Sequence, residues 1–183
     1  MLPDLSDAPP ACVLIRLAGP VAIEDGSAEP RYLSSAQAQV AFARMALERA
    51  GGTGREQLAD TVWPDGLPDT WASALRSVVS RVRSFVAGTT REDGAPADER
   101  GDQPYVVARG GRYLLRLPPG AVIDLECAER EVVEAASAHS AGAFGEALRL
   151  AESAVTCLRR PLLPNHDSDW VTEVRARLAE LLV

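Results

Sequence analysis

The stretch Thr70–Val86, TWASALRSVVSRVRSFV, decides how the rest of the chain is interpreted. At about 100° per residue its apolar side chains share one arc of a helical wheel. The opposite arc carries hydroxyl and guanidinium groups, and no acidic residue lies between Trp71 and Val86. The apolar arc consists of Leu75, Val78, Val79, Val82, Phe85 and Val86, and the polar arc of Ser73, Arg76, Ser77, Ser80, Arg81, Arg83 and Ser84.

The polar arc has two interpretations. Solvated helix faces usually mix both charge signs, because pairs four residues apart then attract each other. Hydroxyls and arginines without acids are instead the groups that contact phosphate oxygens and guanine edges in a major groove. A DNA recognition helix and a surface helix with unpaired arginines are equally compatible with this stretch alone, so its neighbours decide.

Two helices are expected before this one. Ser34 and Gln37 have the spacing of a capping box, which predicts a helix over 36–50 that stops at two glycines. Thr53–Glu56 has the same spacing and predicts a short helix that ends at Trp63. Three helices with short connections, the third amphipathic and basic, form the outline of a helix-turn-helix whose third helix reads DNA.

A β-hairpin is expected after the third helix. Tyr105–Leu117 holds two β-prone runs joined by Gly110 and Gly111, and two such glycines can both take the positive φ of a tight turn. Arg109 and Arg112 flank the predicted tip. A hairpin with arginines at its tip suits a narrow, electronegative minor groove. The alternative is an ordinary edge hairpin decorated with arginines.

Other segments complete the predicted organisation. Short strands are expected at Cys12–Leu17, Val21–Glu24 and Arg31–Leu33, after a flexible arm over 1–11, and a polar mobile loop over 88–103. Amphipathic helices are expected over 125–138, 143–158 and 168–182, and the first two resemble one tetratricopeptide-type hairpin. Such a unit cannot bury its apolar face alone, and the sequence ends within an apolar run, so a continuation or a partner is expected.

The charge distribution is uneven. The net charge of −7 argues against nucleic-acid binding if it is taken as a whole. From Asp124 onward, however, eleven acids face six arginines, whereas the middle of the chain is basic outside one acidic loop. No apolar run approaches the roughly 18 residues of a membrane span, and the N-terminus lacks a basic signal region. We therefore expect a cytoplasmic protein with no membrane association, and interpret Cys12, Cys127 and Cys157 as reduced core thiols.

An enzyme is the least favoured interpretation. His166 neighbours Asp167 without a nucleophile or a third partner, so the two are expected to be a solvated loop pair. His139 lies among small residues at a helix end. No zinc spacing or phosphate-binding glycine loop is present, and no catalytic residue, metal or cofactor is predicted. The three tryptophans are expected to pack against the core.

With these motifs in place, the chain resembles the Streptomyces antibiotic regulatory protein (SARP) family. The matching segments occur in family order: LAGP (17–20), LADTVWPDGLP (58–68), ALRSVVSRVRSFV (74–86), GGRYLLRLPPGAVIDL (110–125) and DSDWVTEVRARLAELLV (167–183). The resemblance implies an α+β fold: an OmpR-type winged helix-turn-helix over 12–120, with a small N-terminal β-sheet and a C-terminal wing hairpin. A shortened, all-α, tetratricopeptide-like bacterial transcriptional activator domain (BTAD) would follow over 121–183.

The resemblance also implies residue roles. Arg76, Ser77, Ser80 and Arg81 would lie nearest the bases, with Arg83 nearer phosphate. Arg109 and Arg112 would hold the wing on DNA. The loop between the second and third helices would contact RNA polymerase through Pro64, Asp65, Gly66, Leu67 and Pro68. The implied function is a transcriptional activator of a biosynthetic gene cluster that binds direct repeats in double-stranded DNA as a homodimer.

One alternative function stays open. The family usually opens its first helix with a basic pair, but this chain has Ala36-Gln37-Ala38 there. Together with the net charge of −7, this departure is compatible with a winged-helix protein-interaction module that no longer binds DNA.

Overall fold

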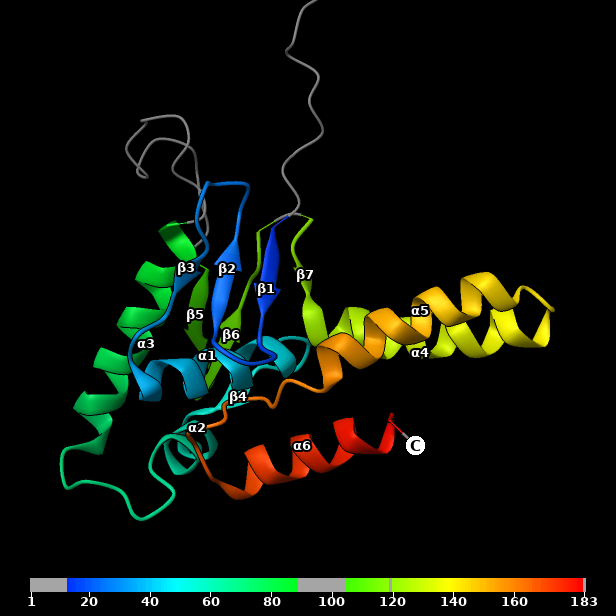
Figure 1. The fold of residues 1–183 in the computed structure, drawn as a ribbon. Helices are drawn as coiled ribbons and strands as arrows, with labels where there is room; N and C mark the ends of the chain where they lie inside the picture. The colour runs from blue at the N-terminus through cyan, green and yellow to red at the C-terminus, as the bar shows by residue number, and fades with distance from the viewer. Residues whose placement is uncertain (1–12, 89–104, 119, 183) are drawn as a thin grey trace, which may run out of the picture.

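The computed structural model describes residues 13–88, 105–118 and 120–182 and has a mixed α/β fold of two small sheets and six helices (Figure 1). The predicted arm over 1–11 lies outside the described residues. So does the predicted loop over 88–103, apart from Gly88, which caps the helix before it.

The first sheet has the strand order β3-β2-β1-β7. Strands β1 (Leu14–Arg16), β2 (Ala22–Glu24) and β3 (Arg31–Tyr32) are antiparallel neighbours and confirm the three predicted strands at shorter lengths. Strand β7 (Val122–Ile123) pairs in parallel with β1 and was not predicted from the sequence. A two-residue strand carries no local pattern, so only its distant partner defines it.

Three helices occur in the predicted order, and α2 and α3 both contact α1. Helix α1 (Ala36–Leu47) is central, since seven of its twelve residues are buried. Helices α2 (Arg55–Val62) and α3 (Trp71–Ala87) follow it. The Phe42 and Phe85 rings meet edge to face with centroids 5.3 Å apart, which fixes α3 against α1.

Both predicted capping boxes are wrong by one residue. Ser35, not Ser34, caps α1, and its hydroxyl accepts the Ala38 N–H at 3.4 Å. At α2 the cap is Gly54, whose N–H donates to Gln57 Oε1 at 3.2 Å. Thr53 cannot serve because it is buried in a strand and donates its hydroxyl to Glu48.

The second sheet has the order β4-β6-β5. Strands β5 (Val106–Arg109) and β6 (Arg112–Leu115) form the predicted hairpin, and its turn glycines have φ of +57° and +72°. Strand β4 (Thr53–Gly54) adds an unpredicted third strand that ties the hairpin to the start of α2.

Three C-terminal helices complete the chain: α4 (Asp124–Ser140), α5 (Phe144–Leu158) and α6 (Asp169–Glu180). All three predicted helices are confirmed. Helices α4 and α5 project from the body as an antiparallel pair, and α6 returns beneath it (Figure 1). Residues of all three contribute to the same continuous core as the sheet and α1.

Buried polar contacts anchor these helices. The carboxylate of Asp124 is buried and accepts the N–H groups of Leu17 at 2.9 Å, Ala18 at 3.1 Å and Leu125 at 2.8 Å. The Gly19 N–H donates to the Pro161 carbonyl at 3.0 Å. The C-terminal helices are therefore fixed to the end of β1.

All three tryptophans lie partly buried against the core, as expected. Cys127 and Cys157 are free and partly buried. Cys157 packs against the core as predicted, whereas Cys127 is not part of the core, and Cys12 lies outside the described residues. Burial raises the pKa of the Cys157 thiol. No helix among the described residues has the length and apolar character needed to cross a bilayer.

Candidate nucleic-acid interface

Helix α3 presents the two arcs that its sequence predicts. All six residues of the apolar arc are buried, with exposed fractions of 8% or less. All seven serines and arginines of the polar arc are exposed. The serines occupy the middle of this exposed face and the arginines its flanks. Because serine side chains are short, a ligand can approach the helix backbone closely between the arginines.

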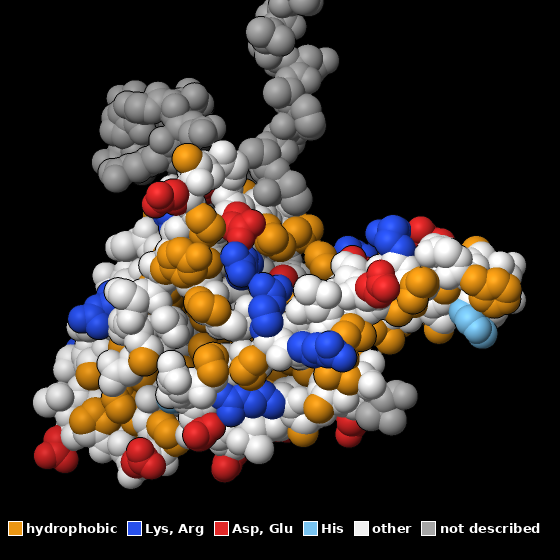
Figure 2. All heavy atoms as spheres, viewed as in Figure 1, with side chains coloured by type: hydrophobic (Ala, Val, Ile, Leu, Met, Phe, Trp, Pro, Cys, Tyr) orange, Lys and Arg blue, Asp and Glu red, His pale blue; other side chains and the backbone are white. Residues whose placement is uncertain are grey.

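The arginines divide between two flanks of α3. Arg76 and Arg83 face the hairpin, and Arg83 Nε donates to the Val106 carbonyl of β5 at 3.2 Å. Arg81 lies on the other flank, where its Nη1 donates to Ser35 Oγ at the start of α1 at 3.2 Å. Figure 2 shows basic side chains at the edge of the molecule that α3 forms.

The hairpin arginines are exposed and differ in their contacts. Arg109 and Arg112 pair directly across the strands at the tip. Arg112 also donates from Nε to the Gly51 carbonyl at 2.9 Å and from Nη2 to the Gly52 carbonyl at 2.5 Å. Arg112 therefore fastens the hairpin to the turn before α2, a role that its sequence position did not predict.

One cleft joins α3 to the hairpin. It has a volume of about 370 Å³ and an apolar floor that includes Val79 and Tyr113. Five arginines line it, and no acidic residue among the described residues does: Arg55, Arg76, Arg83, Arg109 and Arg112. Four of these five come from the surfaces that the sequence singled out, so the fold brings both arginine surfaces to one site.

Arg55 is the member that the sequence analysis missed. It is the first residue of α2, its N–H donates to the Gly111 carbonyl at 2.9 Å, and its guanidinium lies 5.0 Å from the centre of the Trp71 ring. That stacking orients a cation toward the cleft. No local pattern indicates this contact, because Arg55 lies next to Glu56 and looks like an ordinary helix-opening residue.

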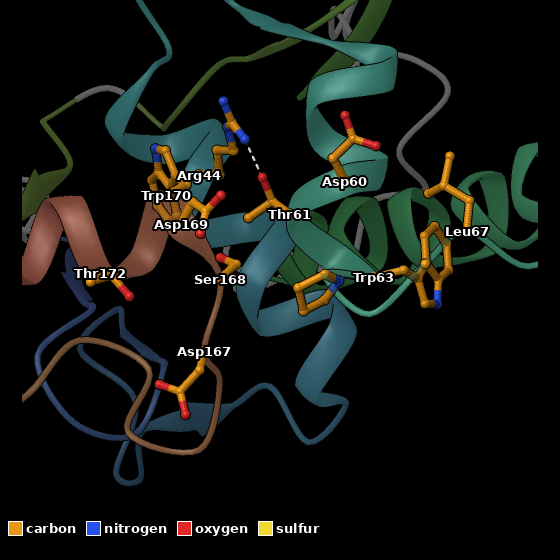
Figure 3. Close-up of a pocket in the computed structure, with 12 residues that line it drawn as sticks. Arg44, Asp60, Thr61, Trp63, Leu67, Asp167, Ser168, Asp169, Trp170 and Thr172 are labelled. Atoms are coloured by element: carbon orange, nitrogen blue, oxygen red, sulfur yellow. Dashed lines mark hydrogen bonds between the residues drawn. The ribbon is translucent and has the colours of Figure 1, made fainter.

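The predicted polymerase-contact residues Pro64, Asp65, Gly66, Leu67 and Pro68 form the loop between α2 and α3. All but the partly buried Pro68 are exposed. Pro64, Gly66 and Leu67 line a second pocket, which is separate from the arginine cleft and is shown in Figure 3.

His166 and Asp167 are both engaged in structural contacts. His166 Nε2 lies 2.8 Å from the Thr61 carbonyl and is partly buried, so the prediction of a solvated His166–Asp167 pair is wrong. Asp167 instead pairs with Arg175 at 2.9 Å. Among the described residues no cluster of three histidine, cysteine or carboxylate side chains has the arrangement of a metal site.

No protein-family model matches the sequence, and no curated protein sequence matches it. Among solved structures, the fold is similar to that of Mycobacterium tuberculosis EmbR in complex with a low affinity phosphopeptide, with a TM-score of 0.74 and 23% sequence identity. The likeness covers 93% of this chain and 42% of the EmbR chain. At this level of identity the likeness concerns the fold.

Proposed function

We propose that this chain is a winged helix-turn-helix regulator of transcription that binds specific sequences in double-stranded DNA. The observation that carries the proposal is the cleft shared by α3 and the β5–β6 hairpin, which five arginines and no described acid line. The overall charge of −7 does not oppose it, because phosphate attraction depends on the local surface.

In this proposal α3 and the β5–β6 hairpin contact different parts of the DNA. The exposed serines of α3 let its backbone approach base edges, and the arginines on its flanks reach guanine or phosphate oxygens. At the hairpin tip, the Arg109 side chain has no hydrogen bond or ion pair with another described residue, whereas that of Arg112 is anchored. This tip would lie over the adjacent groove. Phosphate contacts on both elements would fix the register of α3 along the duplex.

The finer features follow the family resemblance. We propose that the protein acts as a cytoplasmic activator, binds direct repeats as a homodimer and contacts RNA polymerase through the α2–α3 loop. The three C-terminal helices, with their tetratricopeptide-like α4–α5 pair, would serve assembly or effector response as a partial BTAD. The role proposed for the chain is regulatory rather than catalytic.

A second candidate function is a winged-helix protein-interaction module that no longer binds DNA. It is favoured by Arg83 and Arg112, since both donate to backbone carbonyls and so hold the fold together. The absence of a basic pair at Ala36–Ala38 favours it too. In this case the arginine cleft would have a structural role or bind an acidic protein segment.

A gel-retardation assay on random genomic fragments at low salt distinguishes the two candidates. A regulator retards fragments at micromolar protein and, after repeated selection, enriches a common sequence. The interaction module retards none. The selected fragments also show whether the site consists of direct repeats.

A further inference from the structure

A second pocket lies where the start of α6 meets α2 and the α2–α3 loop (Figure 3). Its volume is about 510 Å³, and it is distinct from the arginine cleft. In Figure 3, Trp63 and Leu67 lie on one side of the pocket and Asp169 and Trp170 on the other. Segments about a hundred residues apart in the chain thus build one site.

Two features of the pocket suit an apolar side chain. Trp63 and Trp170 are partly buried against the core and line the pocket. Leu67 is 41% exposed and also lines the pocket. A bulky apolar group placed here would remove these surfaces from water.

The pocket carries a negative charge. Asp60, Asp167 and Asp169 line it, and only Asp167 forms an ion pair within the described part of the chain. Figure 2 shows acidic side chains along the same margin, over the α2–α3 loop and the start of α6. Such a surface attracts cations and repels nucleic acid.

Arg44 also lines the pocket, and its guanidinium is already paired with Glu48 and stacked on Trp170. Its Nε pairs with Glu48 at 3.1 Å, its Nη1 donates to Thr61 Oγ1 and to the Gln57 carbonyl, and its guanidinium lies 5.5 Å from the Trp170 ring centre. It therefore forms part of the floor and leaves the two unpaired aspartates available.

The walls of the pocket are held rigidly. His166 contacts the Thr61 carbonyl, and Arg175 donates to the carbonyls of Leu162 at 2.8 Å and His166 at 2.9 Å. Ser168 caps α6 by accepting the Val171 N–H. A preformed site of this kind does not need to order itself when a ligand binds, which favours affinity.

We infer that this pocket docks a short segment of a partner protein that carries an arginine or lysine beside a bulky apolar side chain. The apolar group fills the space between Trp63, Leu67 and Trp170, and the cation pairs with Asp60 and Asp169. The inference rests on the proposed function in one respect: the α2–α3 loop that forms one wall is the segment proposed to contact RNA polymerase.

The test uses the full chain, immobilised, and a display library of random peptides about a dozen residues long. The enriched peptides are expected to pair arginine or lysine with leucine or an aromatic residue. One enriched peptide is then labelled and titrated with the protein in solution. The double variant Asp60→Asn/Asp169→Asn is expected to bind it at least about tenfold more weakly, equivalent to about 1.4 kcal/mol. The matched control Glu152→Gln/Glu180→Gln removes two exposed carboxylates that do not line the pocket, and it is expected to bind like the parent.

Acidic or uncharged polar peptides, or equal affinities for both double variants, would overturn the inference. Leu67→Ser supplies a second measure that removes no charge, and it too is expected to weaken the peptide about tenfold. Circular dichroism melts verify that each variant is folded. Because these titrations contain no DNA, their outcome is separate from that of the gel-retardation assay.

Discussion

Arg109 and Arg112 lie directly opposite each other at the tip of the β5–β6 hairpin, joined by two glycines of positive φ. Like charges at directly opposed strand positions destabilise a hairpin. The fold relieves part of this repulsion by holding Arg112 on the Gly51 and Gly52 carbonyls. Arg109 is left at the tip as the cation best placed to bind an external anion.

Arg109→Ala and Arg112→Ala should therefore behave differently. Each variant should weaken binding by a similar factor for every DNA sequence, because hairpin arginines contact phosphate rather than bases. Arg112→Ala should also lower the free energy of unfolding by about 1–2 kcal/mol, since it removes two hydrogen bonds to carbonyls. Arg109→Ala should leave that free energy unchanged or slightly raised. Urea denaturation and DNA titrations measure both effects, and equal stability of the two variants would contradict the assignment.

Arg81→Ala should weaken binding to the selected sequence more than binding to other sequences. The side chain lies on the exposed face of α3, where a bidentate contact to guanine is worth about 1–3 kcal/mol. Competition between the selected sequence and point variants of it measures the loss. Arg130→Ala, an exposed arginine on α4, is the matched control. If the Arg81 and Arg130 variants show the same preference as the parent, α3 does not read bases through Arg81.

Gly52→Ala should be strongly destabilising. Gly52 has φ of +68°, and a Cβ there would lie 2.8 Å from Leu114 Cδ2 and 3.0 Å from the Tyr113 carbonyl oxygen. The backbone strain alone is worth about 1–3 kcal/mol. Gly51→Ala is the control, because a Cβ at Gly51 meets nothing within 4 Å. Thermal melts of the two variants should separate clearly, and identical melts would show that β6 does not pack closely on this turn.

Asp124→Asn should loosen the C-terminal helices from the sheet. The carboxylate accepts two N–H groups at the end of β1, and an amide in its place presents one oxygen where two now accept. The expected loss in the free energy of unfolding is about 1–3 kcal/mol. Hydrogen exchange should quicken at Leu17 and Ala18. Unchanged exchange at both amides would contradict the proposed anchoring.

The sequence predicts those parts of the fold whose signal lies within a few consecutive residues. The two arcs of α3 and the glycine pair of the hairpin are complete within a few residues, so periodicity and turn chemistry locate them. Strands β4 and β7 are two residues long and exist only through distant partners. The same limit hid Arg55 and the anchoring of Arg112, because both depend on how α2 and β6 meet in space.

The central claim is that the arginine surface of α3 and the hairpin binds DNA phosphates. Its most direct test is the salt dependence of DNA affinity for the parent and for Arg76→Ala/Arg109→Ala, two exposed arginines of the cleft. If each protomer neutralises about four to six phosphates, log affinity should fall against log salt with a slope of about −4 to −5, and the double variant should be less steep by about 2. An absence of DNA binding at low salt, or the same slope for both proteins, would contradict the account.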